Sequence, residues 1–274
     1  MSNNSSKILK QIISYKILII LCTFYLFVSS VKAQRLEPEI YQIDSEWIYE
    51  YEYIPHNKKD LENIQLMIEE TKKIDKVVMK VVECNDVNLL RIMGINDESN
   101  ALKDRLLQEC YLLEGEKIRE NIGSSIVENN KGIWIHPPRD FFFKILELTP
   151  FPYILKPYTI GREWDWSLEI GSHWGNVKWR EWEEMITNKC SYKITGDTIL
   201  NTKTGNFHCY IVDSYAVSEL GKTYLTSYFN DKYGFIKLDY TNIDGSKIVL
   251  NLIQHNSGSR KAYKVGILNR NYEK

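Results

Sequence analysis

The sequence predicts a mainly β protein, built on an antiparallel, strongly curved sheet or open barrel with a Pro/Phe-rich loop or short helix packed at one end. Several segments alternate apolar and polar residues with the period of two that is typical of half-buried strands. Long helical patterns are scarce, and glycine-containing turns separate the alternating segments. A chain of 274 residues is long enough to bury a full core without help from metals or disulfides.

Residues 1–33 have the layout of a cleaved secretory signal peptide. Lysines precede an apolar block over 17–31, which is shorter than the roughly 20 residues that a membrane-spanning helix needs. Small residues up to Ala33 suit a peptidase, so the mature chain is predicted to begin at Gln34. The alternatives are an uncleaved anchor or a lipoprotein leader acylated at Cys22. We expect an exported protein, located in the periplasm, outer envelope or extracellular space, with no transmembrane span in its mature form.

The mature chain is expected to form one β-sheet domain over 34–255, followed by a loosely ordered tail over 256–274. Within the domain, N-terminal strands over 40–136 lead into a Pro-rich crossover over 137–161. C-terminal strands over 162–255 complete the sheet.

The clearest N-terminal strand runs over 47–54, where Trp47, Tyr49, Tyr51 and Tyr53 alternate with polar residues and should share one face. Further strands are predicted at 76–83, 87–95, 105–113 and 132–136. The segment 60–73 fits a helix or a strand equally well.

The crossover holds five of the seven prolines and six aromatic residues. Proline cannot donate to a strand ladder, so 137–161 is predicted to be a long ordered loop that crosses the sheet. Its apolar composition suggests that it caps one end of the core. Residues 141–148 are a candidate short helix within it.

In the C-terminal half, 164–170 and 190–194 alternate as strands, and two glycine-punctuated strands follow at 202–211 and 228–237. The turn Asp244-Gly245 precedes a last strand.

This pattern resembles a group of uncharacterised exported bacterial proteins with a lipocalin-like or lipoprotein-carrier-like curved sheet. The resemblance covers residues 187–253, about a quarter of the chain. It implies a fold type and an envelope location, and it implies no catalytic residues.

Four cysteines remain after the leader, an even number that suggests two disulfides in an exported protein. The pairs that close the shortest loops are Cys84–Cys110 and Cys190–Cys209. Each would stabilise the fold by roughly 3 kcal/mol in the chain-entropy model. The alternative is free cysteines buried in strands.

Five of the seven tryptophans lie within the segment 163–184, among several carboxylates. Trp164, Trp166 and Trp174 are candidate ligand-binding residues, because exposed tryptophans beside carboxylates can stack on sugar rings. The alternative is that Trp164 and Trp166, which alternate with Leu168 and Ile170, line the inner face of the sheet.

The motif His136-Pro137-Pro138-Arg139 is a second candidate site. His136 and Arg139 on a rigid turn could hold an anionic group. The alternative is a turn that ends a strand, with Arg139 paired to a nearby acid. The five histidines show no metal-ligand spacing, and no nucleophile elbow or phosphate loop is present in the sequence, so we expect no metal, no cofactor and no catalytic residues.

Removing the leader leaves 31 basic and 36 acidic residues, a net charge of 31 − 36 = −5, which disfavours nucleic acid as a partner. The leading hypothesis is an envelope protein that binds a hydrophobic or amphipathic ligand, such as a lipid or an acylated protein, in the concavity of its sheet. One rival is a carbohydrate-binding or glycan-active protein that uses 163–184. Another is a structural or assembly module whose strands are filled by their own side chains.

Overall fold

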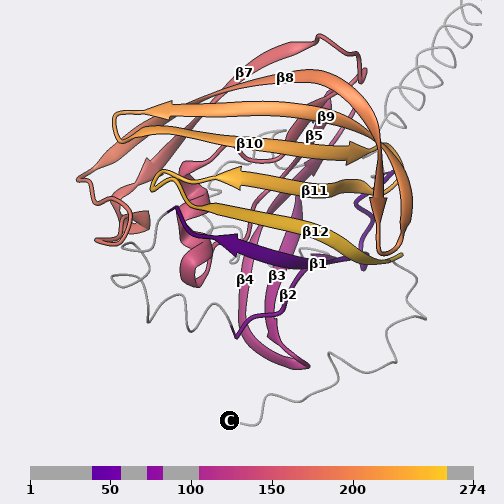
Figure 1. The fold of residues 1–274 in the computed structure, drawn as a ribbon, viewed down its shortest axis with the longest axis horizontal. Coiled ribbons are helices and arrows are strands. Elements are labelled where there is room, and N and C mark those ends of the chain that lie inside the picture. Colours follow the sequence, from indigo (N-terminus) through magenta and orange to yellow (C-terminus); the bar gives the residue numbers. More distant parts are fainter. Residues whose placement is uncertain (1–38, 57–72, 83–104, 258–274) are drawn as a thin grey trace, which may run out of the picture. The chain divides into compact units, whose positions relative to one another are not determined.

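Antiparallel strands form one curved, open sheet in the computed structural model, which describes residues 39–56, 73–82 and 105–257 (Figure 1). The strands are β1 (Glu46–Ile54), β2 (Lys76–Val82), β3 (Arg105–Glu114), β4 (Lys117–Glu128), β5 (Gly132–Ile135), β6 (Tyr153–Leu155), β7 (Glu163–Gly171), β8 (Met185–Thr202), β9 (Gly205–Ser218), β10 (Gly221–Asn230), β11 (Gly234–Thr241) and β12 (Lys247–Asn256). Two short 3-10 helices, η2 (Phe141–Leu148) and η3 (Ser172–Trp174), lie in the connections. The predicted fold class is confirmed.

The strand order is that of an up-and-down meander. Strands β1 to β6 pair in sequence, strands β7 to β12 do the same, and the first strand pairs with the last. Figure 1 shows β7 to β12 and β1 side by side across the front. The order therefore begins at β6 and ends at β7, and among the described strands no backbone ladder joins these two. We call the gap between β6 and β7 the seam.

The aromatic face predicted for β1 points into the core. Trp47 and Tyr49 are almost fully buried. Each also finds a hydrogen-bond acceptor at the start of β11, two strands away: Trp47 Nε1 donates to Tyr233 O at 2.7 Å, and Tyr49 Oη donates to Phe235 O at 2.8 Å. Buried aromatic rings need such partners for their polar atoms. The side chains that fill this core include Phe142, Phe143, Phe229, Phe235 and Tyr240.

The predicted short helix is confirmed as η2, which packs at one end of the core. Its Phe142 is buried and meets Tyr53 of β1 edge to face, with ring centroids 4.7 Å apart. At the end of η2, Leu148 O accepts hydrogen bonds from Asn188 Nδ2 of β8 at 3.1 Å and from Thr223 Oγ1 of β10 at 2.8 Å. Both donor residues are buried and lie in the β7–β12 half of the sheet, whereas Tyr53 lies on β1, so η2 contacts both halves.

The crossover is more regular than predicted. Besides η2, the segment 137–161 contains the edge strand β6, which pairs with β5. Pro152 and Pro157 flank this strand and limit it to three residues, since neither can donate to a ladder.

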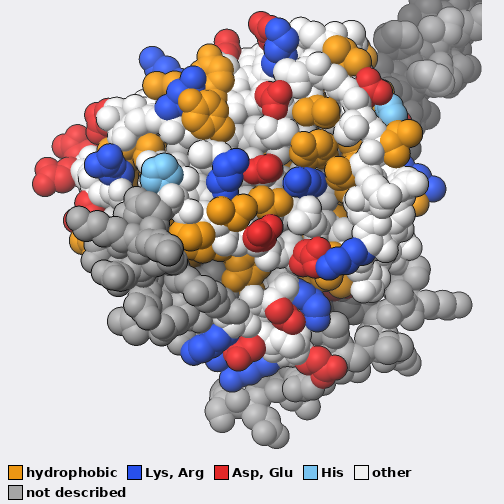
Figure 2. All heavy atoms as spheres, viewed as in Figure 1, with side chains coloured by type: hydrophobic (Ala, Val, Ile, Leu, Met, Phe, Trp, Pro, Cys, Tyr) orange, Lys and Arg blue, Asp and Glu red, His pale blue; other side chains and the backbone are white. Residues whose placement is uncertain are grey.

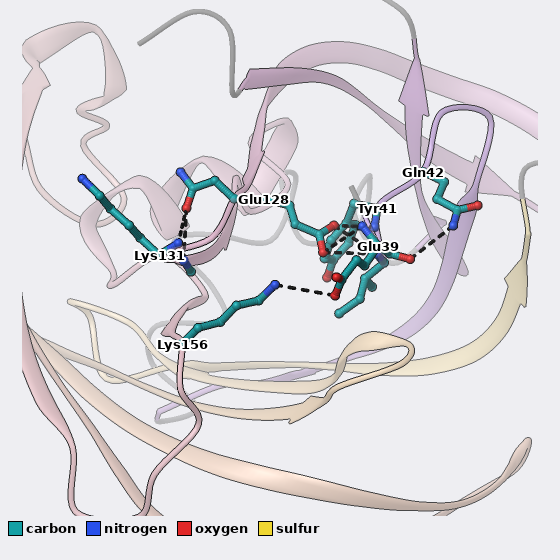
Figure 3. A network of polar contacts seen from close by, with 9 residues as sticks. Glu39, Tyr41, Gln42, Glu128, Lys131 and Lys156 are labelled. Carbon is teal, nitrogen blue, oxygen red and sulfur yellow. Dashed lines mark hydrogen bonds and ion pairs between the residues drawn. The ribbon is translucent and has the colours of Figure 1, made fainter. Parts of the chain in front are cut away.

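A buried carboxylate fastens the first described residues to the sheet (Figure 3). Glu128, at the end of β4, accepts hydrogen bonds from the backbone N–H groups of Glu39, Ile40 and Tyr41, at 2.8 to 3.2 Å. Lys156 lies 3.7 Å from the carboxylate of Glu39. Three successive N–H donors around one carboxylate oxygen pair form an anion-binding concavity, here filled by the protein itself.

The predicted disulfide Cys190–Cys209 is wrong, because both cysteines are free buried thiols. In the β8–β9 hairpin Cys190 lies opposite Ala216, whereas Cys209 lies opposite Thr198. The two thiols are therefore 198 − 190 = 8 residues apart along β8, or roughly 26 Å at about 3.3 Å per residue. A disulfide needs Cα atoms within about 7 Å. Cys110 is also a free buried thiol, and its predicted partner Cys84 lies outside the described residues.

The predicted leader 1–33 and the predicted strand 87–95 also lie outside the described residues, as do most of 60–73 and most of the tail. Within the ranges that the structure describes, no helix is long and apolar enough to cross a membrane.

The outer surface carries charges of both signs. Figure 2 shows Lys and Arg interspersed with Asp and Glu on the face over β7 to β12, with small apolar groups between them. One such group, on β9 and β10, contains Tyr215, Val217 and Tyr224, with Lys222 Nζ 4.1 Å from the Tyr215 ring centroid. A mixed surface of this kind suits a protein that is not steered toward a strongly charged polymer.

Candidate ligand-binding site

Aromatic side chains, instead of a backbone ladder, connect the two edges of the seam. The Tyr153 ring of β6 meets Trp164 and Trp166 of β7, with centroids 5.8 and 6.0 Å apart. Trp166 also packs on Trp134 of β5 at 5.8 Å and on Phe151 at 5.7 Å. Each such pair contributes about 0.5–1.5 kcal/mol beyond its buried area. The seam is therefore held without the regular spacing that backbone pairing would impose.

A pocket of about 350 Å³ opens beside this seam. The strand β5 is short and pairs only with residues 126–128 of β4. Among the described residues, the part of β4 that precedes Ile126 therefore has no strand beside it at this edge, and the pocket lies there. The loop after β5, the helix η2, the strand β7 and η3 surround the resulting space. The pocket is lined by Ser124, Ser125, Trp134, His136, Arg139, Glu147, Phe151, Trp166, Leu168, Glu169, Ile170 and Trp174.

Four of the five candidate binding residues meet in this pocket, although they come from separate segments. They are His136, Arg139, Trp166 and Trp174. The fifth, Trp164, does not line it: its ring stacks on Tyr192 of β8 at 5.3 Å, with an angle of 2° between the planes. Trp164 thus has the inward, packing role that was the alternative for it.

Arg139 lines the pocket, and part of its guanidinium makes no hydrogen bond within the described ranges. Its Nη2 donates to Gly123 O at 2.6 Å, and its Cζ lies 5.3 Å from the centroid of the Trp174 ring. Its Nε is buried and has no hydrogen-bond partner among the described residues. The expected contact with a nearby acid is replaced by a backbone carbonyl and an aromatic face. Because a guanidinium stays charged, this is a half-buried cation with N–H groups left to donate.

His136 is buried beside Arg139 and is neutral. Burial, and then the positive charge of Arg139, lower the pKa of His136 to about 3. Its Nδ1 lies 2.9 Å from Pro137 O, and a carbonyl can only accept, so Nδ1 carries the proton. This leaves Nε2 as an acceptor that faces the pocket.

Glu147 of η2 is the third polar group of the pocket and is only 4% exposed. Burial raises its pKa to about 8, against an opposing effect of Arg139. Its Oε1 lies 3.5 Å from His136 Nε2, which is too long for a hydrogen bond, and has no other partner among the described residues. At neutral pH the carboxyl keeps its proton, so this contact joins two neutral groups and is not an ion pair.

No family model and no curated protein matches the chain. Solved structures with a similar fold come from bacteria. A presumed exported protein with a YmcC-like fold from Bacteroides fragilis has a TM-score of 0.46 at 9% identity, over 80% of this chain and 99% of that one. A presumed lipoprotein from Parabacteroides distasonis has a TM-score of 0.44 at 8% identity, over 79% and 97%. The hypothetical lipoprotein YmcC from Escherichia coli has a TM-score of 0.34 at 8% identity, over 85% and 96%.

The sequence resemblance of the glycine-punctuated strands was also to uncharacterised exported bacterial proteins, and these neighbours are consistent with it. Their names state no ligand and no reaction.

Sequence reasoning missed Glu147, although the signal was present. Glu147 lies between Leu146 and Leu148 in an otherwise mostly apolar block that was predicted to pack against the core. A carboxyl group at such a position is buried only at a cost, which marks it as a candidate for a special role. Its meeting with His136 and Arg139 depends on long-range packing that the local pattern does not contain.

A second, more open hollow of about 580 Å³ lies at the tip of the β8–β9 hairpin, between the β10–β11 turn and the end of β12. It contains one buried polar atom without a hydrogen-bond partner in the described residues, His255 Nε2. The His255 ring packs on Trp47 at 4.8 Å and on Tyr233 at 5.6 Å. The seam pocket holds two charged or ionisable groups with unused polar atoms, and is the stronger candidate.

Proposed function

We propose that this chain is an exported protein that binds a small amphipathic ligand in the seam pocket. Export is supported by the leader-like composition of residues 1–33. Binding is supported above all by one observation: Arg139 and Glu147 line the same pocket, and each has a buried polar atom, Arg139 Nε and Glu147 Oε1, without a hydrogen-bond partner among the described residues.

Unpaired buried polar atoms are costly, at about 1–3 kcal/mol each and more for a charged group. A folded protein rarely keeps two of them in one pocket unless something else satisfies them, such as water or a ligand. A polar ligand group that accepts from Arg139 and contacts Glu147 would remove both penalties at once.

The rest of the pocket suits the apolar part of such a ligand. Trp134, Phe151, Trp166 and Trp174 supply aromatic walls around the polar groups. A volume of about 350 Å³ lies at the lower end of the range for small-molecule sites. The proposed ligand is thus small, with one polar end and an aromatic or aliphatic body; a fatty acid or the acyl chain of a lipid or acylated protein belongs to this class.

The site differs from the one expected in the concavity of the sheet. The described part of the concave side is occupied by the protein's own aromatic residues, including Trp47, Tyr49 and Phe229. The pocket and its unpaired polar atoms, on Arg139 and Glu147, lie beside the seam, where the pairing of the described strands stops. This supports a ligand site at the edge of the sheet instead of its centre.

A carbohydrate site is the second candidate, because Trp166, Glu169 and Trp174 of the Trp-rich segment also line the pocket. Two other tryptophans of the segment are used internally: Trp179 is only 6% exposed, and Trp182 Nε1 donates to Ile170 O at 3.3 Å. The aromatic walls suit a sugar ring, whereas the half-buried Arg139 cation suits an acidic group better. A purely structural module would bind neither.

The test uses 8-anilinonaphthalene-1-sulfonate, a fluorescent amphipathic anion, with the exported form of the protein. Arg139→Gln is expected to weaken binding about tenfold or more, the effect of losing a hydrogen bond to a charged group. The control Arg119→Gln removes the same charge from an arginine paired with Glu114 near the β3–β4 turn, and should leave binding unchanged. Equal binding by both variants, or no binding by the unmodified protein, would overturn the proposal. Selective binding of a neutral glycan would favour the carbohydrate alternative.

A further inference from the structure

The inner part of the seam pocket carries one fixed positive charge and no fixed negative charge at neutral pH. Arg139 is always cationic. His136 is neutral because burial lowers its pKa, and Glu147 is protonated because burial raises its pKa. Glu169 lines the outer rim, where its side chain is exposed and its Oε1 accepts a hydrogen bond from Thr187 Oγ1 at 2.8 Å.

We infer that the ligand of this pocket carries a single acidic group that pairs with Arg139, and that Glu147 is a built-in rival for the same guanidinium. This inference rests on the proposed function and adds to it the charge of the ligand and a means of releasing it.

The arrangement around Arg139 leaves N–H groups that can donate to a further acceptor. Its Nη2 is already used by Gly123 O, and the face of the guanidinium is covered by Trp174. Its Nε remains unpaired and lines the pocket. A carboxylate, sulfonate or phosphate monoester can accept from that edge and neutralise the half-buried cation, which an uncharged ligand cannot do.

When Glu147 is ionised, its own carboxylate can take the place of the ligand's acidic group and neutralise Arg139. Its Oε1 has no hydrogen-bond partner among the described residues, and the charge of Arg139 already acts on it. While the carboxyl is protonated, it can donate toward the acceptor Nε2 of His136, or toward a ligand. Once deprotonated, it supplies a negative charge inside the pocket, which attracts Arg139 and repels an anionic ligand.

The charged and titratable groups that face Glu147 come from several elements. The loop after β5 contributes His136 and Arg139, and β7 contributes Glu169 at the rim. On η2 itself, Lys144 is the other charged residue, and Asp140 precedes the helix. The contacts from β8 and β10 to the end of η2 are made by Asn188 and Thr223, which do not titrate. Burial raises the pKa of Glu147 to about 8, just above neutral pH.

The experiment compares two fluorescent probes over a range of pH. The sulfonate of 8-anilinonaphthalene-1-sulfonate stays ionised throughout, and N-phenyl-1-naphthylamine has a closely similar ring system without the sulfonate. If Glu147 competes for Arg139, the Kd of the sulfonate should rise about tenfold between pH 7 and pH 9, as expected for competition by a group with a pKa of about 8. The Kd of the neutral probe should stay constant.

In Glu147→Gln the sulfonate should bind with the same Kd across this range, and binding of the neutral probe shows that the variant pocket is intact. A Kd of the sulfonate that stays flat in the unmodified protein, or rises equally in Glu147→Gln, would overturn the inference and leave the binding function standing. Failure of the sulfonate to bind at any pH would instead overturn the proposed function.

Discussion

Replacing Glu147 by glutamine should change how the stability of the protein depends on pH. In the folded protein burial raises the pKa of Glu147 to about 8, against an ordinary value of 4.5 in the unfolded chain. Between these values the folded state holds a proton that the unfolded chain has lost. The stability that this group contributes is therefore complete below about pH 4.5 and is lost as the pH rises through about 8.

The magnitude follows from the shift, since one pKa unit corresponds to about 1.4 kcal/mol. Between pH 6.5 and about pH 8.5 the contribution of Glu147 to the free energy of unfolding should fall by about 2 kcal/mol. His136 acts in the opposite direction, because burial lowers its pKa from 6.5 to about 3. Its contribution is complete above pH 6.5 and is lost as the pH falls toward 3, so it changes little in the chosen window.

Urea denaturation followed by tryptophan fluorescence measures this effect, provided that the slope with denaturant is the same at each pH. The free energy of unfolding of the unmodified protein should fall by about 2 kcal/mol relative to that of Glu147→Gln over this window. Glu169→Gln is the matched control, because Glu169 is exposed at the rim of the pocket, and its difference from the unmodified protein should stay constant. A difference between Glu147→Gln and the unmodified protein that does not vary with pH would refute the protonated, buried state of Glu147.

Three further outcomes test the fold. Glu128→Ala removes the acceptor of three backbone N–H groups and should lower the free energy of unfolding by about 3–5 kcal/mol, seen as a lower urea midpoint. An unchanged midpoint would contradict the stabilising role of the Glu128 hydrogen bonds in Figure 3. Alkylation of the unreduced, denatured protein should label both Cys190 and Cys209, because both are free thiols. In the native protein both should react slowly, because burial raises the pKa of Cys190 to about 11 and that of Cys209 to about 12. A peptide that contains both cysteines joined would contradict the register of the hairpin. Gly234→Ala should destabilise the protein by at least about 1–2 kcal/mol, because Gly234 has φ of +77° and an added Cβ would meet the Tyr41 hydroxyl. An unchanged melting temperature would argue against this conformation of the β10–β11 turn.

Local patterns predicted many of the strands and the direction of side chains in β1, although they missed β4. The aromatic face of β1 points inward as its alternation predicts, because a period of two determines which residues share a face. Gly205 and Gly234, which begin β9 and β11, adopt positive φ, as a tight turn requires. The short helix at 141–148 was found from its apolar residues alone.

Pairing over longer distances was not accessible in the same way. The Cys190–Cys209 disulfide was predicted from loop length, but the position of the β8–β9 turn places the two residues far apart along the hairpin. The strand β6 was missed because it is three residues long and lies between prolines. The pocket is an extreme case: His136, Arg139, Glu147 and β7 meet only because the sheet curves until its two edges face each other.

Native mass spectrometry of the exported form, purified from its own host, most directly tests whether the seam pocket holds a ligand. The unmodified protein should carry a small amphipathic molecule with one acidic group, released on denaturation and identified by its mass. The Arg139→Gln variant, purified in the same way, should carry little or none of it, whereas Arg119→Gln should retain it. An unmodified protein that carries nothing, or an Arg139→Gln variant that carries as much as the unmodified protein, would contradict a ligand site built around Arg139 and Glu147.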